Sequence, residues 1–195
     1  MAPITPDSLL TLEAYAKARG DFRARVIAHK QHRTVPLGDH VTLLFEDELT
    51  IRYQIQEMLR IERIFEAEDI RGELDTYNPL IPDGGNWKAT MLIEYPDVDE
   101  RHRMLEALKG IEDRVWVQVA GCERVYAIAD EDLARENEKK TSAVHFLRFE
   151  LTPSMIGALV ARAALAIGVD HPHYIAGIDS VSPEVRTSLM QDLRT

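Results

Sequence analysis

A chain of 195 residues, 45% of them hydrophobic and 29% charged, is long enough to bury a substantial core. Its formal net charge of −10 argues against a nucleic-acid binder, which needs a basic surface to displace counterions, and against docking on an anionic membrane. No run of about 18 apolar residues and no signal-peptide pattern occur, so we expect neither a membrane span nor secretion. The single cysteine, Cys122, excludes an internal disulfide and a cysteine-based metal site, which favours a cytoplasmic location.

The chain begins with a long amphipathic segment. Apolar residues at helical spacing predict a helix over residues 7–32, which Gly20 kinks or splits. We predict that residues 1–195 form a single α+β domain, with residues 1–33 as a long N-terminal helix that is partly separate from it. This helix has more apolar side chains than one face needs, and C2 symmetry is the commonest way to bury such a surface. We therefore expect a homodimer whose interface includes this helix and a C-terminal helix over residues 183–193.

The remaining pattern predicts strands and helices in alternation. Strands are predicted over residues 40–46, 87–95, 115–119, 123–128 and 142–151, and helices over residues 47–65, 97–109, 152–166 and 182–194. Loops are predicted over residues 75–86 and 169–174, a buried helix over most of the apolar stretch 155–169, and a short helix with a loop over the charged segment 130–140. Short connections favour antiparallel pairing. The sequence thus predicts an α+β fold, a mainly antiparallel sheet of about five strands with helices packed on one face or end.

Glu62 is the most informative residue of the predicted helix 47–65. It falls on an apolar stripe where a leucine is expected, and the stripe consists of Ile51, Ile55, Met58, Leu59 and Phe65. A buried carboxylate costs several kcal/mol unless something pairs with it. We therefore predict that Glu62 is largely buried and paired, with Arg148 as the natural partner, or else that this face of the helix lines a pocket.

A pocket between this helix and the sheet would have four candidate ligand residues, Glu57, Glu62, His145 and Arg148. The carboxylates would act as metal ligands or acid–base groups, and a structural ion pair is the alternative. A bound metal is not expected, because the sequence shows no closed ligand set at a recognised spacing; His171 and His173 are weak candidates. Glycine-rich nucleotide motifs and Gly-x-Ser-x-Gly are absent, so the sequence defines no cofactor.

Five segments together resemble an uncharacterised bacterial family, a domain of unknown function whose members are about as long as this chain. These segments are residues 53–62, 80–84, 89–95, 142–149 and 170–174. The resemblance covers nearly the whole chain and implies no activity and no catalytic residues. Genes of this family often lie near those for rubrerythrin-like proteins and iron–sulfur oxidoreductases. That implies, by association only, a link to peroxide defence or iron-linked redox metabolism.

These observations favour a cytoplasmic accessory protein that binds a small ligand, a metal or a protein partner, in that redox context. Two alternatives stay open. One is a small enzyme with a polar site between helix 47–65 and the sheet. The other is a structural interaction protein that acts as a homodimer. Convergence of Glu62, His145 and Arg148 on a solvent-connected cavity would favour a ligand site or an enzyme.

Overall fold

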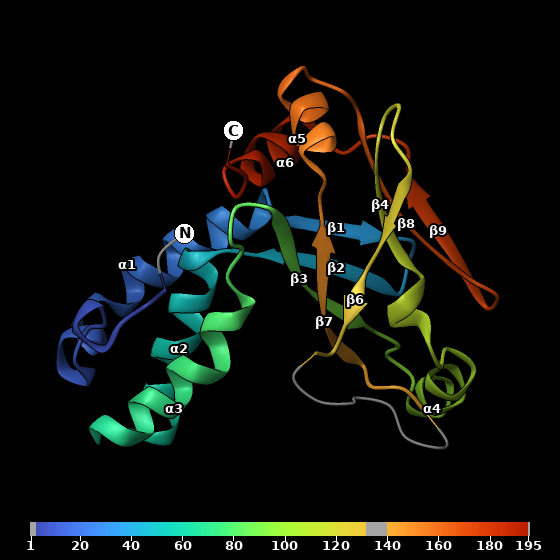
Figure 1. The fold of residues 1–195 in the computed structure, drawn as a ribbon. Helices are drawn as coiled ribbons and strands as arrows, with labels where there is room; N and C mark the ends of the chain where they lie inside the picture. Colours follow the sequence, from blue (N-terminus) through green and yellow to red (C-terminus); the bar gives the residue numbers. More distant parts are fainter. Residues whose placement is uncertain (1–2, 132–139, 195) are drawn as a thin grey trace.

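The computed structural model describes residues 3–131 and 140–194, so most of the segment 130–140, with its predicted short helix, lies outside the described residues. Within the described ranges the strands form two antiparallel sheets, here called sheet A and sheet B (Figure 1). Sheet A has the strand order β1 (Thr34–Leu37), β2 (Val41–Glu46), β3 (Asn86–Ile93), β7 (Val144–Glu150) and β6 (Ile128–Ala129). Sheet B has the order β5 (Arg124–Tyr126), β4 (Val115–Val119), β8 (Leu165–His171) and β9 (Tyr174–Ile178).

The helices lie on both sides of sheet A. They are α1 (Leu12–Gln31), α2 (Glu48–Glu62), α3 (Ala67–Tyr77), α4 (Val98–Ala107), α5 (Pro153–Val160) and α6 (Pro183–Met190), with short 3-10 helices η1 (Pro6–Ser8), η2 (Asn78–Leu80) and η3 (Ile111–Arg114). Helices α1, α2 and α3 lie on one side of sheet A, and sheet B lies on the other (Figure 1). Two helices begin at hydroxyl caps: the Thr152 and Ser182 side chains accept hydrogen bonds from the first turns of α5 and α6.

The predicted α+β class and antiparallel pairing are confirmed, but part of sheet B was missed. The apolar stretch 155–169 is not one helix: α5 ends at Val160, Arg162 adopts the left-handed conformation, and β8 starts at Leu165. A short apolar run cannot be assigned to a buried strand or a buried helix by periodicity alone. The predicted loop after it contains the end of β8 and the start of β9. Strand β1 was also missed, because it contains Pro36, which sheets tolerate at an edge such as this one.

Two apolar clusters stabilise the fold. The larger one lies between the inner faces of the two sheets and continues under α4, α5 and α6. Each strand of sheet A contributes alternate residues to it; in β7 these are Leu147 and Phe149, while Phe146 and Arg148 point to the outer face. The smaller cluster joins α2 and α3 to the N-terminal segment and consists of Ile4, Ile51, Ile55, Leu59, Leu74 and Ile81.

The N-terminal helix packs on its own chain. Helix α1 runs without a break through Gly20, and no side chain lies near that glycine. Tyr15 and Val26 are buried, and Phe22 stacks on Tyr53 of α2. Much of the apolar surface from which we expected a dimer is therefore covered within the chain, and the homodimer stays a prediction.

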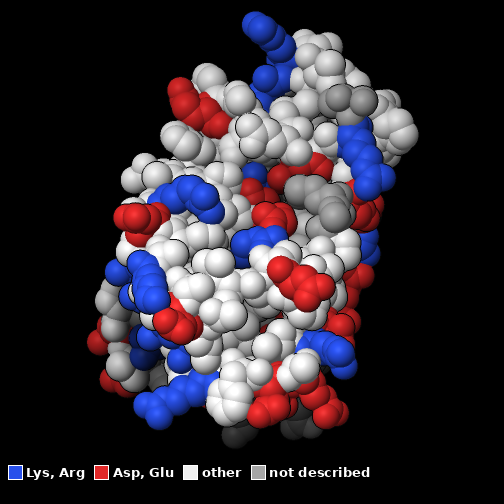
Figure 2. All heavy atoms as spheres, turned by 90° about the vertical axis from the view of Figure 1, so that its left-hand side faces the viewer, with Lys and Arg blue, Asp and Glu red and all other residues white. Residues whose placement is uncertain are grey.

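The helical side of the molecule has a mixed surface. Figure 2 shows basic and acidic side chains interspersed over it, separated by uncharged residues. A nucleic-acid interface instead gathers Lys and Arg on one face. Among the described helices, none has the length and apolar character needed to cross a membrane.

A buried arginine joins α1, β2 and α6. The side chain of Arg33 has no exposed surface. Its Nε donates to the carbonyl oxygen of Phe45 at 2.8 Å, and one terminal nitrogen donates to that of Glu46 at 3.0 Å. The same nitrogen lies 2.5 Å from Oδ2 of Asp192, and the other bonds Ser188 of α6. The planar guanidinium group suits such a set, because its donors point along fixed directions.

The same arginine contacts the start of α2. Its second terminal nitrogen lies 3.5 Å from Oδ2 of Asp47, and Nε2 of His29 lies 2.5 Å from that oxygen. The other oxygen of Asp47 accepts from the backbone N–H of Thr50 and so caps α2. The end of α1 and the start of α2 are thus held at one point beside sheet A.

Replacement of Arg33 by an uncharged residue should lower the free energy of unfolding substantially. In Arg33→Met, Asp192 and three backbone carbonyl groups lose this buried donor, and we expect the free energy of unfolding to fall by about 3–5 kcal/mol. Urea unfolding followed by circular dichroism measures this. Arg23→Met is the matched control, because Arg23 is exposed on α1; it should change stability by less than about 0.5 kcal/mol. A loss below about 1 kcal/mol in Arg33→Met would contradict the role given to this network.

Candidate functional site

A cleft of about 690 Å³ lies between the helical layer and the outer face of sheet A. Its volume falls in the usual range of small-molecule sites, roughly 300–1,000 Å³. The lining residues come from α3 with η2, from β3 and β7, and from the segment after β6. They are Asp75, Thr76, Tyr77, Pro79, Leu80, Lys88, Glu131, Phe146, Leu147 and Arg148.

Two cations face this cleft side by side. Lys88 of β3 lies directly opposite Arg148 of β7 in the strand register, so both side chains lie on the same face of the sheet. Like charges at such positions repel each other. Arg148 is compensated by carboxylates: it donates two hydrogen bonds of 2.7 Å to Glu131 and pairs with Glu150. The hydrogen bonds to Glu131 raise the pKa of Arg148, so this guanidinium group stays charged.

Lys88 has no such direct partner. It is half-buried, and within the described ranges it forms neither a hydrogen bond nor an ion pair. Burial is the main cause that lowers its pKa, and the charge of Arg148 lowers it further, while Glu131, Asp83 and Glu150 act in the opposite direction. An ionisable group with a perturbed pKa in a cleft is typical of a functional site. Lys88 is therefore the group in this cleft whose charge most lacks a partner.

Apolar side chains form the rest of the cleft. Tyr77 and Leu80 contribute from the helical side, and Phe146 contributes from β7; Leu147 borders the cleft, but its side chain lies in the core. Small-molecule sites commonly combine a mainly apolar wall with a few polar groups that fix the orientation of the ligand. The cleft therefore suits a molecule with an apolar body and one charged end.

The structure does not bring the four predicted site residues together. Only Arg148 lines the cleft. Glu57 lies on the other side of α2, where it accepts hydrogen bonds from Tyr15 at 2.7 Å and from Arg19 at 2.8 and 2.9 Å, and pairs with Arg60. Hydrogen bonding by Arg19 is the main cause that lowers the pKa of Glu57 to about 2. Glu57 is a structural residue that ties α1 to α2.

The prediction for Glu62 is wrong. Glu62 is the last residue of α2 and is exposed. The helix ends there because Arg63 adopts the left-handed conformation, with φ of 56°, and Phe65 beyond it is 70% exposed. Helical spacing therefore does not continue past Glu62, and the apolar stripe stops at Leu59. Arg148, the predicted partner, pairs with Glu131 and Glu150 instead.

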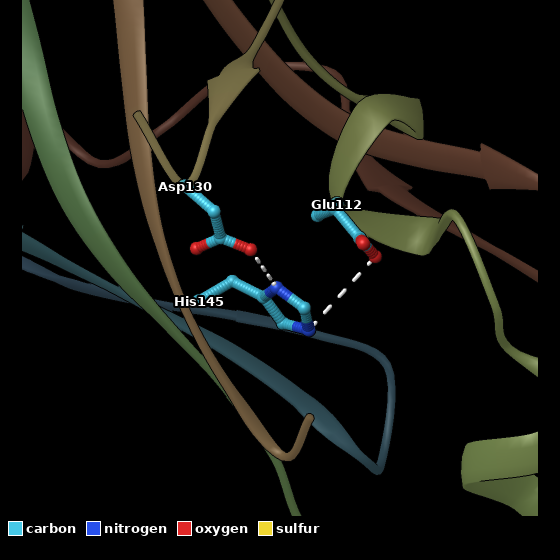
Figure 3. Close-up of side chains that lie close together, drawn as sticks. All are labelled: Glu112, Asp130 and His145. Atoms are coloured by element: carbon cyan, nitrogen blue, oxygen red, sulfur yellow. Dashed lines mark hydrogen bonds and ion pairs between the residues drawn. The ribbon is translucent and has the colours of Figure 1, made fainter. Parts of the chain in front are cut away.

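His145 lies on the opposite face of β7 from Arg148. Its side chain has no exposed surface and points toward the interior, where it meets Asp130 and Glu112 (Figure 3). Of the two weak metal candidates, His171 and His173, the first has both ring nitrogens hydrogen-bonded to backbone groups. Nε2 of His171 lies 3.0 Å from the carbonyl oxygen of Lys109, and Nδ1 of His171 accepts from the backbone N–H of His173. His145 and Arg148 lie on opposite faces because successive side chains of a strand alternate and an odd number of positions separates these two.

Sequence reasoning missed Lys88 and Glu131 as cleft residues. Lys88 alternates with buried residues in β3, so its position is that of an ordinary outer-face residue. Its importance depends on the register that places Arg148 opposite it and on α3 folding over this face, and neither is visible from local sequence.

Comparisons with known proteins identify relatives without assigning a function. A family model described as "Protein of unknown function (DUF3501)" matches residues 3–193. A crystal structure described as a novel protein of unknown function from Burkholderia pseudomallei K96243 has 57% sequence identity and a TM-score of 0.94; the match covers 99% of this chain and 100% of that one. No curated protein matches this chain.

The carboxylate of Glu57 should stabilise the fold in a pH-dependent way. Because its pKa is lowered from 4.5 to about 2 on folding, its contribution is present above pH 4.5 and is lost as the pH falls toward about 2. We expect Glu57→Gln to lower the free energy of unfolding at pH 7 by about 1–2 kcal/mol. The stability of this variant should also fall less than that of the unsubstituted protein as the pH is lowered from 4.5 toward about 2. Urea titrations between pH 2 and 7 measure both effects.

Glu62→Gln is the control for this measurement, because Glu62 lies on the same helix and is exposed. Its effect at pH 7 should stay below about 0.5 kcal/mol. Equal effects of the two substitutions would contradict the structural role of Glu57.

Proposed function

This chain belongs to DUF3501, a family of proteins of unknown function, so its function has to be inferred from its own side chains. We propose that it binds a small anionic molecule in the cleft of sheet A. The ligand has an apolar body and one carboxylate or similar anionic group. Lys88 receives the anionic group, and Tyr77, Leu80 and Phe146 contact the apolar body.

The observation that supports this most directly is the half-buried charge of Lys88, which lies beside Arg148 without a direct ion pair or hydrogen bond of its own in the described ranges. An anion between the two cations would relieve their repulsion and form charge-assisted hydrogen bonds. Glu131 is the anion that pairs with Arg148 in this structure, and the side chain of Glu131 is 48% exposed. Because this pair is bidentate, the ligand anion binds Lys88 without displacing Glu131, and the positive charge of Arg148 beside it adds to the attraction.

The other readings of the sequence have less support from the geometry. An enzyme with a site formed by Glu57, Glu62, His145 and Arg148 would need these residues in one cavity, and they lie in separate surroundings. The homodimer relied on α1, which packs on α2. The link to peroxide or iron metabolism rests on gene association, and the anionic ligand is compatible with it without depending on it.

A fluorescent probe tests the cleft directly. 8-Anilinonaphthalene-1-sulfonate combines an apolar body with one anionic group, and we expect it to bind the folded protein with enhanced fluorescence. In Lys88→Met its affinity should fall at least tenfold, because a charge-assisted contact of about 1.5–3 kcal/mol is lost. Octanoate should displace the probe from the parent protein, whereas 1-octanol, which has no charge, should displace it poorly.

The controls separate this effect from unfolding. Since folding lowers the pKa of Lys88, its charge is unfavourable in the folded state, and Lys88→Met should melt at the same temperature as the parent or higher. Lys17→Met removes an exposed lysine of α1 and should leave probe affinity unchanged. Equal affinity of Lys88→Met and the parent, or equal competition by octanoate and 1-octanol, would refute the proposal.

A further inference from the structure

Three segments that are far apart in the sequence meet behind β7. Glu112 comes from η3, Asp130 follows β6, and His145 belongs to β7 (Figure 3). One ligand atom of each lies within 4.8 Å of the others, and the side chains of His145, Glu112 and Asp130 are 0%, 8% and 8% exposed. Imidazole nitrogen and carboxylate oxygen are both ligand types that divalent first-row metal ions accept.

The two nitrogens of His145 have different surroundings. Nδ1 lies 2.6 Å from Oδ2 of Asp130, while the other oxygen of Asp130 accepts from the backbone N–H of Phe146. Asp130 is thereby fixed in place and orients the ring. Metal-binding histidines commonly have this arrangement, in which the ring nitrogen away from the metal donates to a carboxylate.

The other nitrogen, Nε2, faces oxygen atoms. It lies 3.8 Å from Oε2 of Glu112 and 2.9 Å from Oγ1 of Thr141, and these two oxygens are 3.3 Å apart. Ligand atoms that surround one ion at about 2.1 Å in a tetrahedral arrangement lie about 3.4 Å from each other. The triangle of Nε2, Oε2 and Oγ1 therefore has the size that a single ion requires. The carbonyl oxygen of Ser142, 3.0 Å from Nε2, lies at its edge.

We propose that His145, Glu112 and Thr141 bind one divalent first-row metal ion, such as Zn²⁺, Fe²⁺ or Mn²⁺, and that Asp130 positions the imidazole. No metal was expected from the sequence, because these residues have no recognisable spacing; folding of η3, the end of β6 and β7 brings them together. Ion binding needs an unprotonated Nε2: the Thr141 hydroxyl donates to Nε2 before binding and turns its hydrogen away when the ion binds, while Nδ1–H continues to donate to Asp130.

Metal content and affinity test this site. Protein purified without chelator should contain about one first-row metal ion per chain by elemental analysis. After treatment with EDTA it should bind Zn²⁺ in calorimetry, and Mn²⁺ binding should remove the spectrum of the free ion in electron paramagnetic resonance. The melting temperature should fall on EDTA treatment and return when Zn²⁺ is added.

Three variants assign the ligands. Glu112→Gln and His145→Gln should weaken Zn²⁺ binding at least 100-fold, and Asp130→Asn should weaken it about 10–100-fold through the orientation of the ring. The double variant His171→Ala/His173→Ala is the matched control, because these histidines are the other candidates in the chain, and it should bind like the parent. Circular dichroism verifies the fold of each variant, and Thr141→Val, which preserves side-chain shape, replaces any variant that fails to fold.

The outcomes are distinct. Metal binding that is lost in Glu112→Gln but retained in the double histidine variant supports the site. Binding that is retained in both Glu112→Gln and His145→Gln, or absence of Zn²⁺ and Mn²⁺ binding at millimolar ion, overturns it and leaves a structural ion cluster. The site lies on the opposite face of β7 from the cleft, so binding of the naphthalenesulfonate probe should be unchanged in Glu112→Gln, and either proposal can fail without the other.

Discussion

The guanidinium group of Arg33 is fully buried and binds β2, α6 and the start of α2 at one point. Its bonds satisfy several buried acceptors, and leaving such an acceptor without a donor costs about 1–3 kcal/mol per group. The network therefore fixes one end of the helical layer against sheet A. At the other end α2 and α3 are held by the apolar contacts of the smaller cluster. The cleft lies between these helices and the strands, and its shape depends on both attachments.

Strand β7 separates two kinds of chemistry by its alternation. Its outer face presents Arg148 to the cleft beside Lys88, where the side chains reach solvent and a ligand can enter. Its inner face presents His145 to a buried cluster with Asp130 and Glu112. The segment that follows β6 contributes to both, because Asp130 contacts His145 and Glu131 contacts Arg148. The cleft and the buried cluster are thus adjacent sites that consist of different side chains.

Much of the fold followed from local sequence. The caps at Thr152 and Ser182, the hairpin of β4 with β5, and the alternation in β7 were predictable because each depends on neighbouring residues. Strand β8 was not, since a short buried apolar run has the same composition as a buried helix. Strand β9 is half-exposed and is defined by its pairing with β8. The site was predicted least well. The prediction for Glu62 failed because the apolar stripe was extended past the left-handed turn at Arg63. Glu112 and Lys88 acquire their neighbours only through long-range folding.

Chemical-shift mapping in solution tests the central claim, that the cleft of sheet A is the binding site. In ¹H–¹⁵N spectra of the parent protein titrated with octanoate, the account predicts shifts concentrated in β3, β7 and α3, around Lys88, Phe146 and Arg148. The surface between α1 and α6, at His32 and Gln191, should not respond, although it also forms a depression. Shifts centred on that second surface, or no saturable shifts at millimolar octanoate, would contradict the account.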